Sequence, residues 1–411
     1  MAGADRAGTP PRRRALVVTP WFPYPQDNGS RQRLWALIGG LHERFDIDLV
    51  ALVDEPVPEQ HVEGARARCG RIEVVVRRPF HPRSARAIAA FFHRYPRAVV
   101  AQYTPEMRAA VDRLVGEHSY DIVVVSQIHV ARYVEHLVHH ARLLDDFELA
   151  VIRDVDPNTS VPARLRQLLT WTKQRWYARH VVRSFDACVV VSEEERAAVN
   201  DVAPDTWVAV VPNGVDLETN TLRHDDVEPD TIIHAGPIAF YANREAVDWF
   251  AQQVLPAVRA TRPDARLLVT GRTGSAGDLP EGPGVEYTGY IEDIRPAIGA
   301  AWLSVVPLRR GGGTRLKILE SLALGTPVVS TSKGVEGLGL VAGREVLVAD
   351  TASDFARATV GLLRDPDARA ELRAAGRSAV ETRYGWGPIV ASFVDLVEEL
   401  IRRRETPPGK A

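Results

Sequence analysis

Cysteine, lysine and long hydrophobic runs are scarce or absent in this sequence. The 411 residues include only two cysteines, Cys69 and Cys188, which lack the C-x-x-C spacing of metal and redox sites. Their scarcity argues against a disulfide framework and structural zinc and favours a reducing compartment. No stretch of about 18 apolar residues occurs, as a membrane-spanning helix would need. The arginines at 12–14 are followed by only five residues before Pro20, too few for the hydrophobic region of a signal peptide. We therefore expect a cytoplasmic protein.

Charge and size narrow the class of protein further. The formal net charge is only −2, which gives no support for a nucleic-acid partner, so any electrostatic function must be local. Hydrophobic residues make up 45% of the chain, as in a globular protein, and 411 residues are more than one core normally organises. We expect two domains, with disordered tails at 1–11 and 405–411.

The most informative stretch, WLSVVPLRRGGGTRLKILESLALGTPVVST, covers residues 302–331. A short buried strand is predicted at 303–306, followed by three glycines whose backbone can approach a ligand closely because no Cβ intervenes. Thr314 is predicted to cap a helix whose apolar residues recur at core spacing and which ends at Gly325. A second strand follows at 328–330. The stretch therefore predicts a strand, a glycine loop, a helix and a strand in succession.

Two cations, Arg315 and Lys317, occupy the predicted first turn of that helix. The helix dipole already makes this end positive, so each cation should destabilise the helix by a few tenths to about 1 kcal/mol. A bound anion reverses the sign, and a diphosphate commonly occupies a glycine-rich turn between a strand and a helix. Lys317 is also one of only four lysines among 51 basic residues. Glu320, one turn later, is placed to accept hydrogen bonds from vicinal hydroxyls such as those of a ribose.

This stretch resembles the signature of the retaining, nucleotide-sugar-dependent glycosyltransferases of family 4. The resemblance implies that Lys317, with Arg315, holds the donor diphosphate as the catalytic pair, and that Glu320 binds the ribose. The family usually has a second Glu eight positions before the first, where this sequence has Gly312. Contacts with the donor sugar must then come from the glycine backbone or from elsewhere. The glycine loop expected to contact the donor consists of Gly311, Gly312, Gly313 and Thr314.

A second strand, glycine loop and helix are predicted near the N-terminus. Strand 15–19 is followed by Asn28, Gly29 and Ser30, which open a helix. In the family this loop lies beside the donor phosphates and the acceptor, so Gly29 is a donor-side candidate and Arg33 an acceptor-side candidate. The alternative is a structural glycine, which is the commoner reason for glycine at such a turn.

The resemblance adds three loops of the second domain to the donor site. A helix is predicted after the first of these loops, with Asn243 as its N-cap and Arg244 nearby. The resemblance assigns Gly236 and Pro237 to the diphosphate, Tyr290 and Ile291 to the base, and Val335 and Glu336 to a loop that closes on the donor.

Short apolar runs alternate with helical patterns along the whole chain, which predicts parallel sheets. The predicted fold class is α/β, specifically GT-B, the fold of the family: two facing Rossmann-like domains with a C-terminal helix that crosses back to the N-terminal domain. The predicted divisions are a tail at 1–11, an N-terminal acceptor-binding domain at 12–216 joined by helix 387–404, a linker at 217–230, and a nucleotide-sugar-binding domain at 231–386. The strands are expected at 15–19, 47–53, 72–76, 121–126, 142–144, 186–192, 207–211, 231–235, 266–270, 285–287, 303–306 and 328–330.

Two segments of the first domain combine basic and aromatic residues and suit an anionic acceptor or a phospholipid surface. Residues 74–105 contain no acidic residue, and 157–185 repeat the pattern. Ordinary amphipathic helices in an arginine-biased sequence account for the pattern equally well. Asp145 and Asp146 follow a predicted strand and are acceptor-side candidates, as is Glu148. The basic residues are Arg77, Arg78, Arg83, Arg86, Arg94, Arg97, Arg164, Arg166, Lys173, Arg175, Arg179 and Arg183, and the apolar ones include Phe80, Ile88, Phe91, Phe92, Trp171, Trp176 and Tyr177.

Several other residues have both a functional and a structural interpretation. His136, His139 and His140 have the spacing of helical metal ligands, but no matching third group accompanies them, which favours a solvated surface. His234 could touch a phosphate or be a core histidine. The remaining pair, Arg309 and Arg310, flanks the glycine loop and could aid the diphosphate or simply lie at the surface.

These features predict a retaining glycosyltransferase that moves a hexose-type sugar from a nucleotide-diphosphate donor to a hydroxyl of a glycan, lipid-linked or small-molecule acceptor. No cofactor and no metal are expected, because fixed cations would hold the diphosphate. No convincing pair of catalytic carboxylates of the glycosidase kind is found. The alternatives are a sugar-nucleotide epimerase of the same architecture and a non-catalytic sugar-nucleotide binder. The expected location is the cytoplasm. The alternative is a weak peripheral contact with an anionic membrane at the inner face of the plasma membrane.

Overall fold

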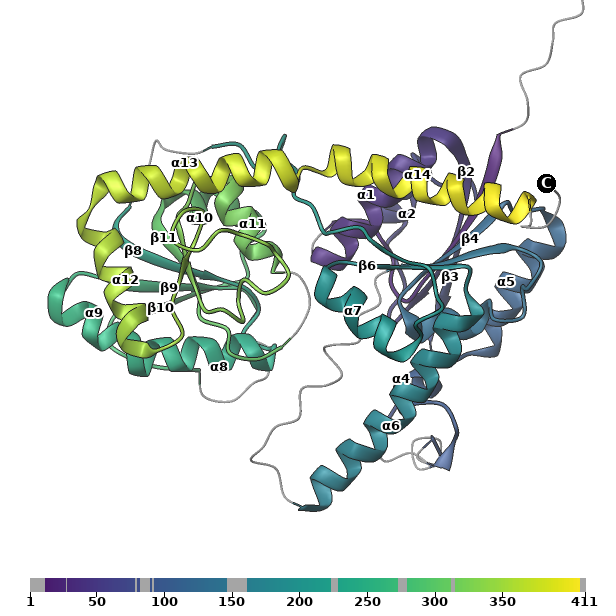
Figure 1. Ribbon diagram of the computed structural model, residues 1–411, viewed down its shortest axis with the longest axis horizontal. Coiled ribbons are helices and arrows are strands. Elements are labelled where there is room, and N and C mark those ends of the chain that lie inside the picture. Colours follow the sequence, from purple (N-terminus) through teal and green to yellow (C-terminus); the bar gives the residue numbers. More distant parts are fainter. Residues whose placement is uncertain are drawn as a thin grey trace, which may run out of the picture. The chain divides into compact units, whose positions relative to one another are not determined.

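A computed structural model describes residues 12–406 except 27, 78–79, 82–88, 91, 146–160, 223–227, 273–278 and 312–314, and gives only the backbone of 161–167. The chain divides into two compact units. Unit 1 comprises Met1–Val211 and Val390–Ala411, and unit 2 comprises Pro212–Ile389. Figure 1 shows a sheet with helices packed around it in each unit. None of the described helices combines the length and apolar character that a membrane span needs.

Unit 1 is built on a seven-stranded parallel sheet of order β3-β2-β1-β4-β5-β6-β7. The central strands are almost wholly apolar because helices cover both faces of such a sheet, and all five residues of β4 are buried. The strands are β1 (Arg13–Thr19), β2 (Phe45–Val53), β3 (Ile72–Val76), β4 (Ile122–Ser126), β5 (Ala141–Asp145), β6 (Ala187–Val190) and β7 (Val208–Val210). The helices are α1 (Gly29–Arg44), α2 (Glu59–Arg66), α4 (Arg97–Gln102), α5 (Pro105–Glu117), the 3-10 helix η1 (Ile128–Tyr133), α6 (Val161–Ser184), α7 (Glu193–Val202) and α14 (Trp386–Glu405).

Unit 2 is built on a six-stranded parallel sheet of order β10-β9-β8-β11-β12-β13. Its strands are β8 (Glu228–Ala235), β9 (Arg266–Thr270), β10 (Val285–Gly289), β11 (Ala301–Val306), β12 (Val328–Ser330) and β13 (Leu347–Val348). Its helices are α8 (Tyr241–Trp249), the π-helical turn η3 (Phe250–Val254), α9 (Leu255–Thr261), α10 (Arg295–Ala300), α11 (Leu316–Ala323), α12 (Ala352–Arg364) and α13 (Pro366–Arg383). The prediction of two Rossmann-like units with parallel sheets is confirmed.

The strand orders fix where a ligand can bind in each unit. In unit 2 the chain runs outward from β8 through β9 to β10, and then returns to pair β11 with the other edge of β8. Unit 1 reverses in the same way between β1 and β4. Loops diverge at such a reversal, and in open α/β sheets ligands bind there, beyond the carboxyl ends of the strands. The loops after β8 and β11, and after β1 and β4, are therefore the places to look for a site.

The two units separate at Val211 and Pro212, ahead of the predicted linker at 217–230. Val211 N donates to Val190 O at 2.9 Å in unit 1, whereas Val215 N donates to Tyr384 O at 2.8 Å in unit 2. Strand β8 already begins at Glu228, inside the segment predicted as linker, and 223–227 lie outside the described residues. The backbone hydrogen bond from Val215 to Tyr384 therefore places the segment after Pro212 in unit 2.

Helix α14 belongs to unit 1 from Val390 onward. It packs closely on α1, because a Cβ at Gly40 would lie 2.0 Å from Val390 Cγ1 and 3.2 Å from Val394 Cγ2. Asn28 caps the N-terminus of α1, where its side chain accepts a hydrogen bond from Arg31 N.

Candidate functional site

Three glycines lie directly after or near the carboxyl ends of β8, β9 and β11 in unit 2. Gly236, Gly271 and Gly311 have φ angles of 142°, 114° and 92°, a region that side chains rarely tolerate. A Cβ at Gly236 would lie 2.6 Å from Lys317 Nζ, and one at Gly271 would lie 2.6 Å from Gly236 O. The backbone and the Lys317 ammonium therefore approach each other closely at the reversal between β8 and β11.

Lys317 is held in this position by Asn243. Its Nζ donates to Asn243 Oδ1 at 2.8 Å, and Asn243 Nδ2 donates to Pro237 O at 3.0 Å. The amide thus connects helix α11, which carries the cation, to the loop after β8. The predicted capping role of Asn243 is wrong: α8 begins at Tyr241, and the buried Asn243 lies inside its first turn with its side chain engaged by Pro237 and Lys317. Asn243 is the residue of this site that the sequence did not reveal.

The environment of Lys317 lowers its pKa to about 7. Burial is the main cause, and the nearby Arg315 guanidinium adds to it, while Glu320 acts in the opposite direction. Arg315 is itself buried and is the N-cap residue of α11, one position before the helical turn in which the sequence places it. Two buried cationic side chains thus lie together at the N-terminus of a helix. This arrangement favours the binding of an anion.

The other donor-side candidates of unit 2 are distributed over neighbouring loops. Tyr290 directly follows β10 and is 56% exposed, with Arg272 Cζ 4.9 Å from its ring centroid. Ile291 beside it is partly exposed. Glu320 is partly buried one turn after Lys317. Gly312, Gly313 and Thr314 lie outside the described residues, and the prediction of Thr314 as the helix cap is wrong because the N-cap of α11 is Arg315.

The loop after β12 contributes fewer polar groups than expected. Val335 packs against the apolar cluster that contains Leu319 and Leu338. Glu336 is exposed and forms an ion pair with Lys333. The Val335 side chain is therefore part of the apolar packing of unit 2.

His234 is a core histidine. It has no exposed surface, and its Nδ1 lies 2.9 Å from Val305 O. Its pKa is lowered well below the usual value, first by burial and then by Lys317, so the ring is neutral at physiological pH. His234 is therefore an uncharged part of the core near Lys317.

Arg309 is engaged by helix α8, where it forms an ion pair with Glu245 and its Cζ lies 5.5 Å from the Trp249 ring centroid. His136 occupies a turn and forms a contact with Asp112 through Nε2 at 2.8 Å. Within the described ranges, no group of three His, Cys, Asp or Glu side chains is arranged to hold a metal ion.

In unit 1, two acceptor-side candidates contact each other. Arg33 on α1 donates through Nη2 to Asp145 Oδ1 at 2.6 Å and through Nε to Asp145 Oδ2 at 3.2 Å. Arg33 Nη1 also donates to Val211 O at 2.9 Å. Both side chains are buried, at 2% and 1% exposure. The pair joins α1, which begins at Gly29, to the end of β5, and Asp146 and Glu148 lie outside the described residues.

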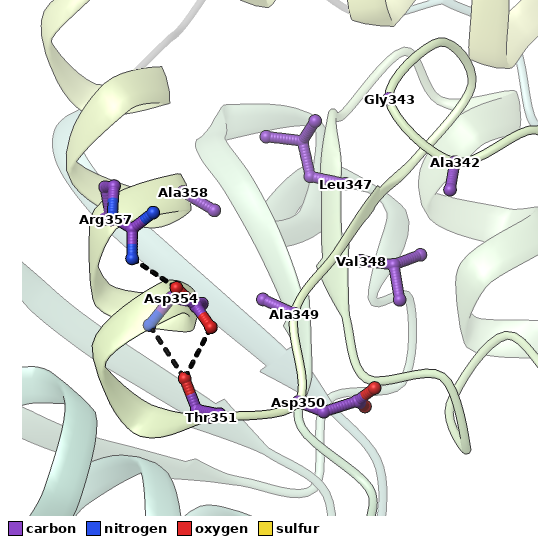
Figure 2. A pocket seen from close by; sticks show the side chains of 10 residues that line it. All are labelled: Ala342, Gly343, Leu347, Val348, Ala349, Asp350, Thr351, Asp354, Arg357 and Ala358. Atoms are coloured by element: carbon purple, nitrogen blue, oxygen red, sulfur yellow. Dashed lines mark hydrogen bonds and ion pairs between the residues drawn. The ribbon is translucent and has the colours of Figure 1, made fainter.

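A separate cavity of about 540 Å³ lies beside β13 and the start of α12 in unit 2. Figure 2 shows that its polar lining is already engaged: Thr351 contacts Asp354, and Asp354 pairs with Arg357. None of the predicted site residues lines it. The cavity is therefore distinct from the cluster around Lys317.

Comparison with known proteins identifies the second unit. Residues 229–365 match the family model Glycosyl transferases group 1. A GDP-mannose-dependent monoacylated alpha-(1-6)-phosphatidylinositol monomannoside mannosyltransferase of Corynebacterium glutamicum is 32% identical over 148 residues, or 33% of this chain. The match covers 39% of that relative, so the chain aligns with less than half of its length. An uncharacterized 44.6 kDa protein of the cps region of Klebsiella pneumoniae is 19% identical over 402 residues, covering 92% of this chain and 98% of that protein.

Solved structures share the fold over nearly the whole chain. Sucrose-phosphate synthase from Thermosynechococcus elongatus has a TM-score of 0.72 at 18% identity, covering 95% of this chain and all of that one. Anabaena HepE in complex with UDP-glucose has a TM-score of 0.67 at 12% identity, covering 94% and 99%.

The fold is the GT-B architecture of these structures, with two Rossmann-like units each built on a parallel sheet. Within that fold, residues 229–365 of unit 2 are the part that matches the Glycosyl transferases group 1 model.

Proposed function

We propose that this protein transfers a sugar from a nucleotide-diphosphate donor to an acceptor hydroxyl, with the donor diphosphate held beside Lys317. The observation that carries the proposal is the position of Lys317 Nζ, which Asn243 fixes against Gly236 at the strand reversal of unit 2. A lysine with its pKa lowered to about 7 by burial is poised to regain its full charge when an anion arrives.

The chemistry proposed is retaining and independent of metal. The bond between the anomeric carbon and the diphosphate oxygen breaks as the acceptor oxygen bonds to the same carbon, and the acceptor proton passes to the departing phosphate oxygen. Lys317 and Arg315 then stabilise the negative charge that develops on the leaving group, which is the largest contribution such a site can make.

Thermal-shift screening with UDP-, GDP-, ADP- and dTDP-sugars identifies the donor, because a bound ligand stabilises the folded protein by mass action. The selected donor is then incubated alone and with candidate acceptors. We expect transfer only when an acceptor is present. An epimer formed from donor alone would favour a sugar-nucleotide epimerase. Saturable binding without transfer to any acceptor pool would favour a non-catalytic binder.

Replacing Glu320 with glutamine should weaken binding of the nucleotide. The neutral amide accepts less strongly from ribose hydroxyls, and a hydrogen bond to a charged group contributes about 1.5–3 kcal/mol, so a loss of roughly ten-fold in affinity is expected. Isothermal titration of the nucleoside diphosphate measures it, with the exposed Glu371→Gln on α13 as the matched control. Unchanged affinity in Glu320→Gln would assign this carboxylate a structural role.

Nucleotide binding should be accompanied by proton uptake at pH 8. The pKa of Lys317 is about 7 in the free protein, so the amine is mostly neutral at pH 8, and an adjacent diphosphate raises that pKa. About one proton should be taken up, and affinity should fall as pH rises above 7. Calorimetry in buffers of different ionisation enthalpy measures the uptake. Lys317→Arg is the control, because a guanidinium is already protonated and should take up none. An enthalpy independent of the buffer in the wild type would contradict the assignment.

A further inference from the structure

Helix α6 of unit 1 has an unusual charge composition. Its 24 residues include six basic side chains and no acidic one. The C-terminal half is anchored in the core of unit 1 through Tyr177, Val181 and Val182. Figure 1 shows the N-terminal half projecting beyond the sheet of unit 1. A basic helix that extends from its own unit presents a surface rather than filling a core.

Large apolar side chains are exposed on and beside this helix. Leu168 is 60% exposed, Leu169 50% and Trp176 46%, and Phe92 on the neighbouring segment is 84% exposed. Leu169 and Trp176 are seven positions apart and therefore share one side of the helix. Lys173 lies between them, and its Nζ donates to His93 O at 2.9 Å, which places Phe92 beside the same side. We call Phe92, Leu168, Leu169 and Trp176 the α6 surface.

Cationic groups surround the α6 surface. Arg94 and Arg179 are exposed, and Arg179 has no ion-pair partner among the described residues. The pKa of His93 is lowered first by burial and then by the neighbouring cations Arg132, Arg94 and Lys173. The carboxylates of Asp201 and Asp205 pair with Arg175 and Arg183, in the half of α6 nearer its C-terminus.

We propose that the α6 surface binds an anionic phospholipid bilayer. Exposed leucine, phenylalanine and tryptophan side chains on a basic helix are the combination that enters the boundary between headgroups and acyl chains. The cations beside them attract anionic headgroups, so binding depends on the lipid charge and falls with ionic strength. The surface lies wholly within unit 1 and needs no donor, so the inference stands apart from the proposed transfer reaction.

Flotation of the full-length protein with vesicles tests the proposal. Vesicles of phosphatidylcholine alone are compared with vesicles containing about 30% of phosphatidylglycerol, a composition of roughly physiological charge. The protein should float with the anionic vesicles in low salt, remain unbound with the neutral ones, and lose most of its binding when the ionic strength is raised above physiological values. Absence from the anionic vesicles in low salt would overturn the proposal.

Two variants separate the apolar and the charged contributions. The double variant Leu169→Ser/Trp176→Ser removes exposed apolar groups, and Lys173→Gln/Arg179→Gln removes two charges. Each should lower the vesicle partition coefficient by about ten-fold or more. Val341→Ser/Arg364→Gln is the matched control, because it removes an exposed apolar side chain and an exposed arginine from unit 2. Equal loss in the control and the α6 variants would overturn the assignment of this surface.

Two further measurements test whether the α6 surface binds a second copy of the chain or takes part in donor binding. Light scattering in the absence of lipid reports whether the Leu169→Ser/Trp176→Ser change dissolves a dimer, and a dimer without vesicle binding would assign the surface to a second copy and overturn the proposal. Stabilisation by the nucleotide sugar should be retained in the α6 variants, because the Lys317 cluster lies in unit 2. Vesicle binding and donor binding can therefore fail independently.

Discussion

Replacing Lys317 with methionine should lower turnover by about ten-fold or more while leaving the ligand-free protein folded. The ammonium would provide a charge-assisted contact of about 1.5–3 kcal/mol, strongest when charge develops on the departing diphosphate. Methionine keeps most of the side-chain length, so the surrounding residues need not collapse. Initial rates at saturating donor measure the effect, and Arg357→Met, an exposed substitution on α12, serves as the control. Turnover near that of the wild type would count against the proposed role.

The same variant has a predicted signature in stability that an exposed lysine would not give. Burial holds the pKa of Lys317 at about 7 in the folded protein, below the ordinary value of 10.5. The unfolded chain therefore binds more protons between these pH values, and the free energy of unfolding of the wild type should rise with pH through that window. Lys317→Met should lose this rise and should be at least as stable near pH 7. Urea unfolding at several pH values tests it, and a variant less stable than the wild type at pH 7 would contradict it.

Replacing Arg33 with methionine should destabilise unit 1 by about 3–5 kcal/mol, because it leaves the Asp145 carboxylate buried without its cation. The ion pair is almost wholly removed from solvent, with Arg33 at 2% and Asp145 at 1% exposure. The substitution also removes the donor to Val211 O, the last residue before the chain enters unit 2. Chemical denaturation followed by a probe in unit 1 measures the loss.

Two variants give this prediction its controls. Arg13→Met breaks the exposed pair with Glu405 and should change stability by less than about 1 kcal/mol. The double variant Arg33→Met/Asp145→Leu should recover much of the lost stability, since a buried ion pair can be replaced by packed apolar groups. If Arg33→Met were no more damaging than Arg13→Met, the pair would not be the anchor that its burial indicates.

Stability and function are arranged differently in the two units. In unit 1 the buried cation Arg33 is fully engaged by Asp145, so it holds α1 and β5 together and has little left for a ligand. In unit 2 the cation Lys317 is held by the neutral amide of Asn243 and has no direct ion pair among the described residues. A buried cation supported by a neutral partner destabilises the free protein and gains most from an anion.

Local patterns in the sequence determined the elements and the fold class. The sequence predicts strand 266–270 with the bounds that β9 has, and strand 328–330 with those of β12. These predictions succeed because buried strands of a parallel sheet are short, mainly apolar runs, and β9 is followed directly by Gly271, whose positive φ suits glycine. The cation pair at the start of α11 can also be recognised from the sequence. Two positive charges there oppose the helix dipole, and a bound anion would make that arrangement favourable.

Only the tertiary structure decided which polar groups meet. Asn243 and Lys317 are 74 residues apart, and Arg33 and Asp145 are 112 apart, so no local spacing relates them. The chemistry of Asn243 suits a helix cap, but packing of α8 against the loop after β8 directs its amide to Lys317 instead. The lowered pKa of Lys317 is likewise a property of burial, which composition does not encode. Sequence specified the elements because their causes are local, whereas the partners of each charge depend on which strands lie side by side at the centre of each sheet.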